Sequence, residues 1–369
     1  MIDAPGLLWT MLAFLAAIGP LIFFHELGHY LAGRWFGVKA KAFSIGFGRA
    51  VAGWHDRRGT HWKVGWLPLG GYVKFAGDMN PASQPDAAWV NLPAEERNQT
   101  FQAKPLWQRA IIVAAGPLTN FVIAIGLFMA VFAAIGEPRT PPVIAGVVEG
   151  SAADRAGLEA GDRVISIGGT TIRRFEDMAS VVAIRPGEMM EVRFERGGVE
   201  QTLTFAPDSI VERDRFGNEA RVGRLGIAAG EQEIARLSAT ELPGAAIAHT
   251  WRSLTMMVVT LKQLVLGKRD VSEMAGPVKM AKISGEVATL GVASFVMFMA
   301  FISINLGFIN LLPIPMLDGG HLAMYAIEGV RRKPLGPQTT EWAFRTGLML
   351  VLALMLFVTI NDIASLGRG

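Results

Sequence analysis

The sequence contains no cysteine, and charged residues make up only 18% of its 369 positions. Without cysteine, neither a disulfide nor a thiolate metal site can form, so histidine and carboxylate would have to hold any metal ion. The scarcity of charge and a mean hydropathy of +0.35 argue against a disordered chain and favour membrane segments. The net charge of +3 is too small to predict nucleic-acid binding, which relies on clustered lysine and arginine.

Four apolar stretches are candidates for crossing a bilayer, which takes about 20 residues of helix. Residues 4–24, 110–136 and 287–317 carry no charge, and residues 346–360 follow Trp342, a residue type that anchors helices at the membrane interface. No basic segment precedes the first stretch, so we interpret it as a retained helix and not as a cleaved signal peptide. The predicted fold class is a polytopic α-helical membrane protein with transmembrane helices at about 5–33, 108–136, 288–317 and 342–361.

A fifth apolar segment, residues 244–267, is expected to lie along the membrane interface and not to span the bilayer. It contains His249, Arg252 and Lys262, each of which is costly at the bilayer centre. Apolar residues recur around them at helical spacing, as in an amphipathic surface helix. Whether this segment spans the bilayer decides which helix ends lie on the same side of the membrane. A fifth span would reverse the orientation of every segment that follows it.

Basic residues predict the orientation of the spans. The segment that joins the first two spans, residues 34–109, carries eleven lysines and arginines. Residues 331–333 and Arg345 add four more between the last two spans. Because positively charged loops stay in the cytoplasm, both segments should face inward and both chain ends outward.

The inner end of the first span carries the pattern His25-Glu26-x-x-His29. Two histidines at i and i+4 share one helix face and can hold a zinc ion at about 2.0–2.1 Å. Glu26 would not bind the metal, but it can act as general base toward an attacking water. The alternative is two interfacial histidines beside a glutamate that reaches toward water. Ionisable residues inside apolar runs are rare and usually functional, which favours the zinc site.

A catalytic zinc takes three protein ligands and leaves one position open. Asp318 is the candidate third ligand, because it ends the long uncharged run of the third span. Pro313 and Pro315 break the helix just before it, and such a break is tolerated at membrane depth where it lines protein or a wet cavity. Asp318 lies on the same side as the two histidines only if residues 244–267 do not span the membrane.

The remaining histidines are weaker candidates for the third ligand. His55 and His61 lie in a polar loop, where we expect them to be solvated. His321 lies one helical turn beyond Asp318. It could lie next to the metal ligands without binding the ion, or it could be a helix-terminal residue whose hydrogen bonds are satisfied locally. His249 is expected on the outer side of the membrane and is thereby excluded.

Residues 137–230 are charged, glycine-rich and patterned as short strands, which predicts a water-exposed β-rich domain. Residues 151–162 resemble the S-x-A-x-x-A-G-L-x-x-G-D core of PDZ domains, which bind a peptide at a sheet edge. Leu225, Gly226 and Ile227 are candidates for the loop that would hold a peptide carboxylate, with an ordinary β-turn as the alternative. The domain would gate access to the membrane site or act as a rigid spacer. Residues 1–136 and 231–369 are then the two membrane parts.

Residues 61–77 predict a β-hairpin, because two short strands rich in aromatic and β-branched residues flank Gly70 and Gly71. Its tryptophans would let it dip into the membrane, or they are ordinary interfacial anchors. A protease must unwind a helical substrate before it can reach a peptide bond, and an exposed hairpin edge can pair with the released strand. Gly70 and Gly71 are therefore candidate substrate-binding residues.

H-E-x-x-H in a first span, a PDZ-like insert and N-x-x-P-x-P-x-L-D-G at residues 310–319 together resemble the site-2 protease family of intramembrane zinc metalloproteases. The nearest type within it is the bacterial regulator of sigma-E protease, and the resemblance covers essentially the whole chain. It implies one Zn²⁺ held by His25, His29 and Asp318, with Glu26 as the base. In this family an element similar to the 40–80 region is a membrane re-entrant β-loop.

The resemblance also implies a substrate and a location. The substrate would be a single-pass membrane protein, such as an anti-sigma factor, already trimmed by another protease. The enzyme would lie in the bacterial inner membrane, with its site toward the cytoplasm and the insert outside. Asn310 would hold substrate backbone or the oxyanion, or else cap carbonyls freed by the helix break. Gly116-Pro117-x-x-Asn120 resembles a family motif that we expect to pack around the site.

One departure from the family is visible, since its best-known members carry two tandem PDZ domains and this chain has room for one. Two functions fit the features above. The first is a zinc endopeptidase that cleaves the transmembrane segment of its substrate. The alternative is a non-proteolytic membrane scaffold or metal-handling protein with a peptide-binding module. Glu26 favours the enzyme, because zinc binding alone needs no general base.

Overall fold

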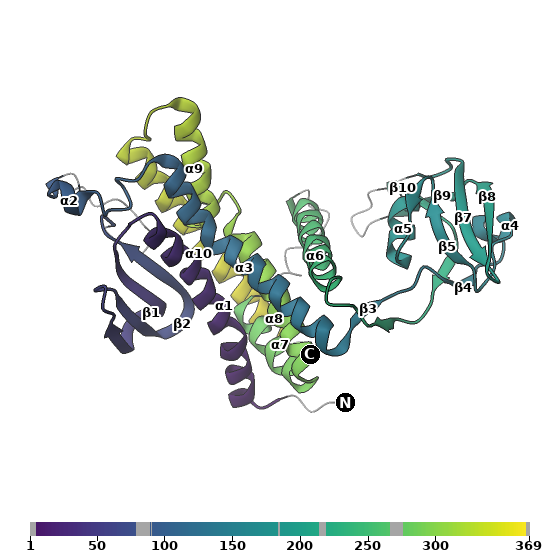
Figure 1. Ribbon diagram of the computed structural model, residues 1–369, viewed down its shortest axis with the longest axis horizontal. Coiled ribbons are helices and arrows are strands. Elements are labelled where there is room, and N and C mark those ends of the chain that lie inside the picture. Colours follow the sequence, from purple (N-terminus) through teal and green to yellow (C-terminus); the bar gives the residue numbers. More distant parts are fainter. Residues whose placement is uncertain are drawn as a thin grey trace. The chain divides into compact units, whose positions relative to one another are not determined.

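The computed structural model describes residues 5–78, 89, 91–183, 185–213, 219–265 and 276–366. The chain forms two compact units, which are described separately (Figure 1). The first, called the membrane unit, comprises Met1–Val131, Pro243–Leu261 and Val271–Gly369. The second, called the inserted unit, comprises Phe132–Leu242 and Lys262–Asp270.

Four helices in the described part of the chain are long and apolar enough to cross a membrane, as predicted. They are α1 (Leu7–Trp35), α3 (Leu106–Ile135), α8 (Val292–Asn310) and, within α10 (Pro337–Leu366), residues Gln338–Ile363. α6 (Leu242–Val265), the segment expected at the interface, is not one of them. Among its described residues, the membrane unit also contains three shorter helices, α2 (Ala94–Arg97), α7 (Pro277–Thr289) and α9 (Asp318–Arg331).

The third span is shorter than the predicted helix over residues 288–317. Gly291, at φ +104°, separates α7 from α8, and residues 311–317 form turns between α8 and α9. Pro313 and Pro315 lie in these turns, and their rings remove the backbone donors that a continuing helix would need. The helix break expected from the two prolines is therefore present, and it shortens the span.

The sequence did not predict α7, which packs along α1. The indole N–H of Trp9 in α1 donates to the carbonyl oxygen of Gly285 in α7 at 3.3 Å. At the start of α7, the fully buried carboxylate of Asp362 in α10 accepts a hydrogen bond from the backbone N–H of Lys279 at 2.9 Å. A carboxylate at this end satisfies helix donors that have no partner within the helix. α7 is thereby held between the first and last spans.

A hairpin of two antiparallel strands follows α1: β1 (Ala40–His55) and β2 (His61–Phe75). The Asp56 carboxylate organises the turn between them. It accepts hydrogen bonds from the backbone N–H groups of Arg58 at 2.8 Å and Thr60 at 2.9 Å, and from the indole N–H of Trp62 at 3.0 Å. The Trp62 hydrogen bond is the main cause that lowers the pKa of Asp56 to about 2, and the backbone donors add to it. An ionised carboxylate therefore ties the turn at neutral pH.

The sequence placed the centre of this hairpin at Gly70 and Gly71, and that placement is wrong. Both glycines lie inside β2, where Gly71 pairs with Ile45. They accompany a bend in the strand: Gly70 has φ +87°, and Gly46 and Gly48 on β1 both have φ +83°. In the sequence, this pair of glycines suggests a two-residue hairpin turn. In the structure, the pair lies at a bend within a long strand.

The hairpin packs against α1, as Figure 1 shows. The ring centroids of Tyr30 and Trp62 lie 5.3 Å apart, and those of Phe43 and Trp62 lie 4.3 Å apart in a stacked arrangement. Tyr30 and Phe43 belong to a buried cluster that also contains Val73 and Phe75 of β2. Aromatic packing thereby fixes the hairpin to the helix that carries H-E-x-x-H, and its depth in a bilayer stays a prediction.

The inserted unit contains a four-stranded sheet in the order β6-β5-β7-β8, and Figure 1 labels its strands β5, β7 and β8. On β7 the alternate residues Met190, Val192 and Phe194 are buried, as expected for a strand with one face on a core. The four strands are β5 (Arg163–Ile167), β6 (Thr170–Thr171), β7 (Met190–Arg196) and β8 (Val199–Phe205). The other elements are β4 (Ile144–Val147), α4 (Ala152–Ala156), α5 (Phe175–Ala183), β9 (Asp208–Arg213), β10 (Glu219–Arg224) and β11 (Ile227–Ala229).

The two ends of the inserted unit are joined, since β3 (Glu137–Arg139) pairs with β12 (Glu233–Ala235). The fully buried carboxylate of Glu137 accepts hydrogen bonds from the guanidinium of Arg139, at 2.6 Å, and from that of Arg174. Burial alone would raise the pKa of Glu137, but the hydrogen bonds from Arg174 and Arg139 outweigh it and lower the pKa. A strand pair and a buried ion cluster therefore close the base of this unit.

Candidate metal centre

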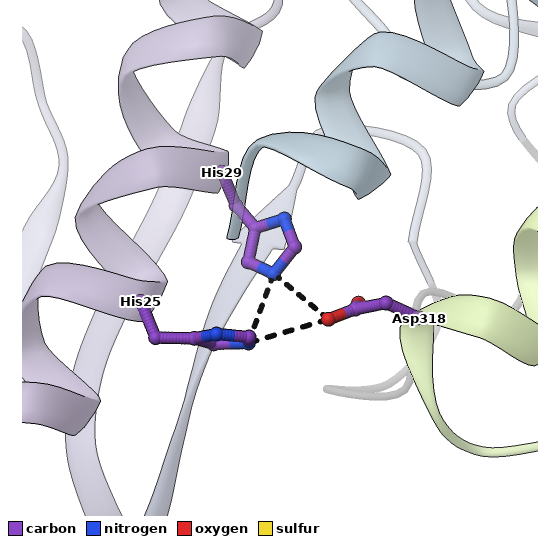
Figure 2. Close-up of side chains that lie close together, drawn as sticks. All are labelled: His25, His29 and Asp318. Carbon is purple, nitrogen blue, oxygen red and sulfur yellow. Dashed lines mark hydrogen bonds and ion pairs between the residues drawn. The ribbon is translucent and has the colours of Figure 1, made fainter. Parts of the chain in front are cut away.

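His25 and His29 of α1 meet Asp318, the first residue of α9, although the two helices are far apart in sequence (Figure 2). The Nε2 atoms of the two histidines lie 3.3 Å apart. Both face the same carboxylate oxygen, Oδ2 of Asp318, at 3.3 Å from His25 and 3.5 Å from His29. The structure thus brings together the three predicted ligands, and none of the three side chains is more than 18% exposed.

The spacing of these three atoms fits a tetrahedral zinc ion. With metal–ligand bonds of about 2.0–2.1 Å, neighbouring ligand atoms of a tetrahedron lie about 3.3–3.4 Å apart. The observed separations are 3.3, 3.3 and 3.5 Å. Over the residues that the structure describes, this is the single group of three or more histidine or carboxylate side chains close enough to hold a metal. Three ligands with a fourth position open is the composition of a catalytic zinc site.

α3 presents a backbone carbonyl to His29. Nδ1 of His29 lies 2.9 Å from the carbonyl oxygen of Ile112, which can only accept, so in the neutral ring Nδ1 carries the proton and Nε2 has the lone pair. Gly116 makes this approach possible, because a Cβ there would collide with the His29 ring. On the facing helix, a Cβ on Gly28 would lie 2.5 Å from the carbonyl oxygen of Ala115. Glycines on both helices therefore allow α1 and α3 to come close enough for this hydrogen bond.

His25 contacts α3 through a side chain. The amide nitrogen Nδ2 of Asn120, a fully buried residue, lies 3.0 Å from Nδ1 of His25. The backbone carbonyl of Asn120 accepts a hydrogen bond from Oγ of Ser303 in α8 at 2.7 Å, so the residue joins three helices. The sequence assigned the Gly116-Pro117-x-x-Asn120 motif only a packing role. The sequence signal for a role at the site was the polar side chain of this residue inside a charge-free span, because polar residues there are usually functional.

Glu26 lies beside the ligands, is 7% exposed, and is held by β2. The backbone N–H of Val73 donates a hydrogen bond to its carboxylate. Gly71 lets the strand come this close, because a Cβ there would lie 2.9 Å from Cγ of Glu26. Gly70, the other candidate for substrate contact, instead packs against the ring of Phe47.

Residues 311–317 deliver Asp318 to the site. The backbone N–H of Leu317 donates to the carbonyl oxygen of Ile314 at 3.0 Å, which closes the last turn before α9. Met316 in this turn has φ +84°, a conformation that residues other than glycine rarely adopt. Such backbone strain costs on the order of 1–3 kcal/mol and persists where surrounding contacts impose it, most often at functional sites.

A cavity of about 180 Å³ opens onto the three ligands. Its lining includes Glu26, Gly71, Asn310, Met316 and His321. Two of the residues proposed from the sequence for substrate contact, Gly71 and Asn310, therefore reach the space next to the ligands.

The other histidines take different positions. The rings of His55 and His61 stack on each other beside the hairpin turn, with centroids 4.5 Å apart. His249 of α6 contacts the ring of Phe128 at 4.5 Å between centroids. His321 lines the cavity, and its ring lies 5.0 Å from that of Phe344. It is the one of these four that lies next to the ligand group, as its place one turn after Asp318 predicted.

In the inserted unit, Leu225, Gly226 and Ile227 line a cavity of about 250 Å³ beside α5. The carbonyl oxygens of Leu225 and Gly226 accept hydrogen bonds from the backbone N–H groups of Ala153, at 2.9 Å, and Val148, at 2.8 Å. The loop is thus fixed by the segment around α4 and borders the cavity. Peptide binding at this loop stays a prediction.

Comparisons with known proteins agree with this site. The sequence profile of peptidase family M50 matches residues 13–354. The chain is 43% identical over 358 residues to a candidate zinc metalloprotease of Agrobacterium fabrum, a match that covers 96% of this chain and 95% of that protein. It is 35% identical over 385 residues to the metalloprotease MmpA of Caulobacter vibrioides, which covers 97% and 96%. A solved PDZ domain from Listeria monocytogenes matches 26% of this chain and 93% of its own, at 14% identity and a TM-score of 0.20, which is too low to assign a fold.

The chain therefore belongs to peptidase family M50, the family of the site-2 proteases, and the resemblance found in the sequence is confirmed. It is a zinc-dependent metalloprotease and a multi-pass membrane protein.

Proposed function

We propose that the protein is an intramembrane endopeptidase of the site-2 type, in which His25, His29 and Asp318 hold one Zn²⁺ and Glu26 is the general base. One observation carries this proposal: three ligand atoms lie 3.3–3.5 Å apart beside a buried glutamate, at a helix apolar enough to cross a membrane. A scaffold or a metal-handling protein would need the ligands, but not a glutamate positioned beside them.

The residues of the site divide the chemistry between them. A bound zinc ion would act as a Lewis acid that polarises the scissile carbonyl and makes the attacking water more acidic. Glu26 accepts the proton of this water and then gives it to the leaving amine nitrogen. The hydrogen bond from the Val73 N–H keeps the Glu26 carboxylate in one orientation. Asn310, on the cavity wall, donates its amide N–H to the substrate carbonyl oxygen as negative charge develops there.

The substrate in this proposal is a single-pass membrane protein whose transmembrane helix unwinds at the site. Residues 71–75 of β2 pair with residues 40–45 of β1 on one side, and their other side borders Glu26 and the cavity. An extended segment that added to this edge would pass the ligands with its peptide bonds exposed. The hairpin would thus hold the substrate as a strand at the point of attack.

The inserted unit would select the substrates that reach this edge. Its cavity beside Leu225, Gly226 and Ile227 lies between a helix and a strand end, the type of place where PDZ domains take a peptide. Binding of a newly exposed chain end there would favour membrane proteins already trimmed by another protease, such as an anti-sigma factor. A unit that acts only as a spacer would leave substrate choice unchanged when this loop is altered.

Co-expression with a tagged single-pass membrane protein tests the proposed activity. We expect the wild-type protein to cut within the transmembrane segment, and the Glu26→Gln protein to leave it intact while still binding zinc. A membrane-permeable chelator should stop the cleavage. Equal cleavage by wild type and Glu26→Gln would refute the assignment of the base.

The absence of native cysteine allows a direct test of orientation in the bacterial inner membrane. Single cysteines can replace Arg58, exposed in the hairpin turn, and Gln201, exposed on β8 of the inserted unit. A membrane-impermeant maleimide should label Gln201→Cys from the outer side and Arg58→Cys only after the membrane is opened. The reverse pattern would overturn the proposed topology.

A further inference from the structure

Asn120 has a polar side chain whose presence the three ligands do not explain. It is fully buried in α3, within a run from Ala110 to Ile135 that carries no charge. Its amide nitrogen Nδ2 lies 3.0 Å from Nδ1 of His25, and its Oδ1 atom is buried without a hydrogen-bond partner among the described residues. An unmet buried hydrogen bond destabilises the folded state, so apolar packing alone would favour a different residue here.

His29 shows what a metal-binding imidazole needs at the ring nitrogen that does not bind the metal, namely a hydrogen-bond acceptor. Its Nδ1 faces the carbonyl oxygen of Ile112 at 2.9 Å, and this oxygen accepts and cannot donate. The proton of the neutral ring is therefore on Nδ1, and Nε2 points at the other ligands with a free lone pair.

His25 needs the same arrangement, because its Nε2 faces Nε2 of His29 and Oδ2 of Asp318, both at 3.3 Å. Nε2 can bind a metal only when the ring proton is on Nδ1, and that proton then needs an acceptor. Among the described residues, the Asn120 amide lies within hydrogen-bond distance, with its nitrogen toward Nδ1. A half turn of the amide would bring its oxygen, a group of nearly the same shape, to the same place. The oxygen supports metal binding, whereas the nitrogen would move the ring proton to Nε2 and block it.

We propose that Asn120 is a positioning residue, whose amide oxygen accepts the Nδ1–H of His25 and holds this ring in the tautomer that binds zinc. The opposite orientation, with the nitrogen toward Nδ1 as in this structure, favours the tautomer in which Nε2–H donates to Asp318, whose Oδ2 atom lies 3.3 Å from Nε2. Amide orientation and metal binding are therefore coupled. The hydrogen bond from Ser303 goes to the backbone carbonyl of Asn120 and does not involve its amide. This inference rests on the proposed metal site and assigns a further residue to it.

The test is zinc affinity, measured on the purified, metal-stripped full-length protein by competition with a chromophoric chelator. Asn120→Leu keeps the branched shape of the side chain and removes the acceptor, and we expect zinc affinity to fall about 10- to 100-fold. Asn120→Asp offers only acceptors, and we expect it to bind zinc at least as tightly as the wild type. Ser303→Ala is the matched control, since it removes a hydrogen bond to Asn120 that does not reach His25, and its affinity should stay close to that of the wild type.

Wild-type affinity in the Asn120→Leu protein would overturn the proposal. If that variant fails to fold, weakened binding by Asn120→Asp would overturn it equally, because a merely structural role gives an acceptor no advantage. Failure of the metal site itself would look different: the wild type would bind no zinc, or Asp318→Ala would bind zinc as tightly as the wild type.

Discussion

Three glycines allow the side chains of the site to meet. Gly28 and Gly116 let α1 and α3 approach, so that the His29 ring reaches a backbone carbonyl of α3. Gly71 lets β2 approach α1, so that a backbone N–H reaches Glu26. At each position a methyl group would occupy space that another element already fills, and the site depends on these close approaches as much as on its ligands.

Gly71→Ala tests this dependence at the base. The added Cβ would lie 2.9 Å from Cγ of Glu26, so the carboxylate or the strand must shift. A displacement of about 1 Å at a reacting group can cost about 100-fold in rate, and we expect a loss of cleavage of this order. Zinc content should be unchanged, because Gly71 does not touch the ligands. Cleavage rate and zinc content of the same preparation provide the measurement.

Gly126→Ala is the matched control for this substitution, since a Cβ at Gly126 of α3 would meet nothing within 4 Å. It should leave both cleavage and zinc content at the wild-type level. Wild-type cleavage by Gly71→Ala would show that β2 does not position Glu26.

At the scale of elements, the hairpin depends on one ionised turn residue and on aromatic packing. Asp56 accepts hydrogen bonds within the turn and a further one, at 3.4 Å, from the hydroxyl of Tyr30 in α1. The hairpin turn is thereby tied to the helix that carries H-E-x-x-H. Because β2 also contacts Glu26, loosening of this turn should reach the site.

Acid should weaken the hairpin through Asp56. Its pKa is lowered from 3.8 to about 2, chiefly by the Trp62 hydrogen bond, so the folded state prefers the ionised form. The stabilisation is complete above about pH 4 and is lost as the pH falls toward 2. We expect Asp56→Asn to unfold at lower temperature than the wild type at pH 7, and the difference to shrink between pH 4 and pH 2. A difference that grows on acidification would contradict this role.

The elements that the sequence predicted are those whose signal is local. Charge-free runs predict the spans, and H-E-x-x-H predicts two ligands on one helix face, because both depend on helical spacing alone. Asp318 could be predicted because cysteine is absent and a carboxylate ends an apolar run. These inferences needed residue types and order, but no knowledge of packing.

The features that the sequence did not predict depend on contacts between distant segments. The start of α7 is held by a hydrogen bond to Asp362 of α10, and the sequence of α7 itself does not predict this contact. Gly70 and Gly71 suggest a turn until the paired strand with its own bend is known. Asn120 becomes part of the site only when α3 is placed beside α1. Local sequence patterns thus predicted the metal ligands and the general base. The residues that position them could not be predicted, because their roles depend on the packing of distant segments.

At the scale of the whole molecule, the two units can be followed separately. All nine tryptophans belong to the membrane unit, so tryptophan fluorescence reports the unfolding of that unit. A metal that binds only the native state stabilises it, by about 2.7 kcal/mol when its free concentration is 100 times Kd. Chelation should therefore lower the tryptophan-detected melting temperature, and added zinc should restore it.

The Asp318→Ala protein serves as the control for metal removal. With one ligand missing, its melting temperature should respond little to chelator. An equal drop in the wild type and in this variant would show that chelation acts elsewhere in the molecule.

The convergence of α1 and α9 on one zinc ion is tested most directly by the zinc content of the purified full-length protein, determined by elemental mass spectrometry. We predict one zinc per chain in the wild type and in Glu26→Gln, which keeps all three ligands, and a large loss of zinc in Asp318→Ala. One zinc per chain in Asp318→Ala would contradict the assignment of His25, His29 and Asp318 as the metal site.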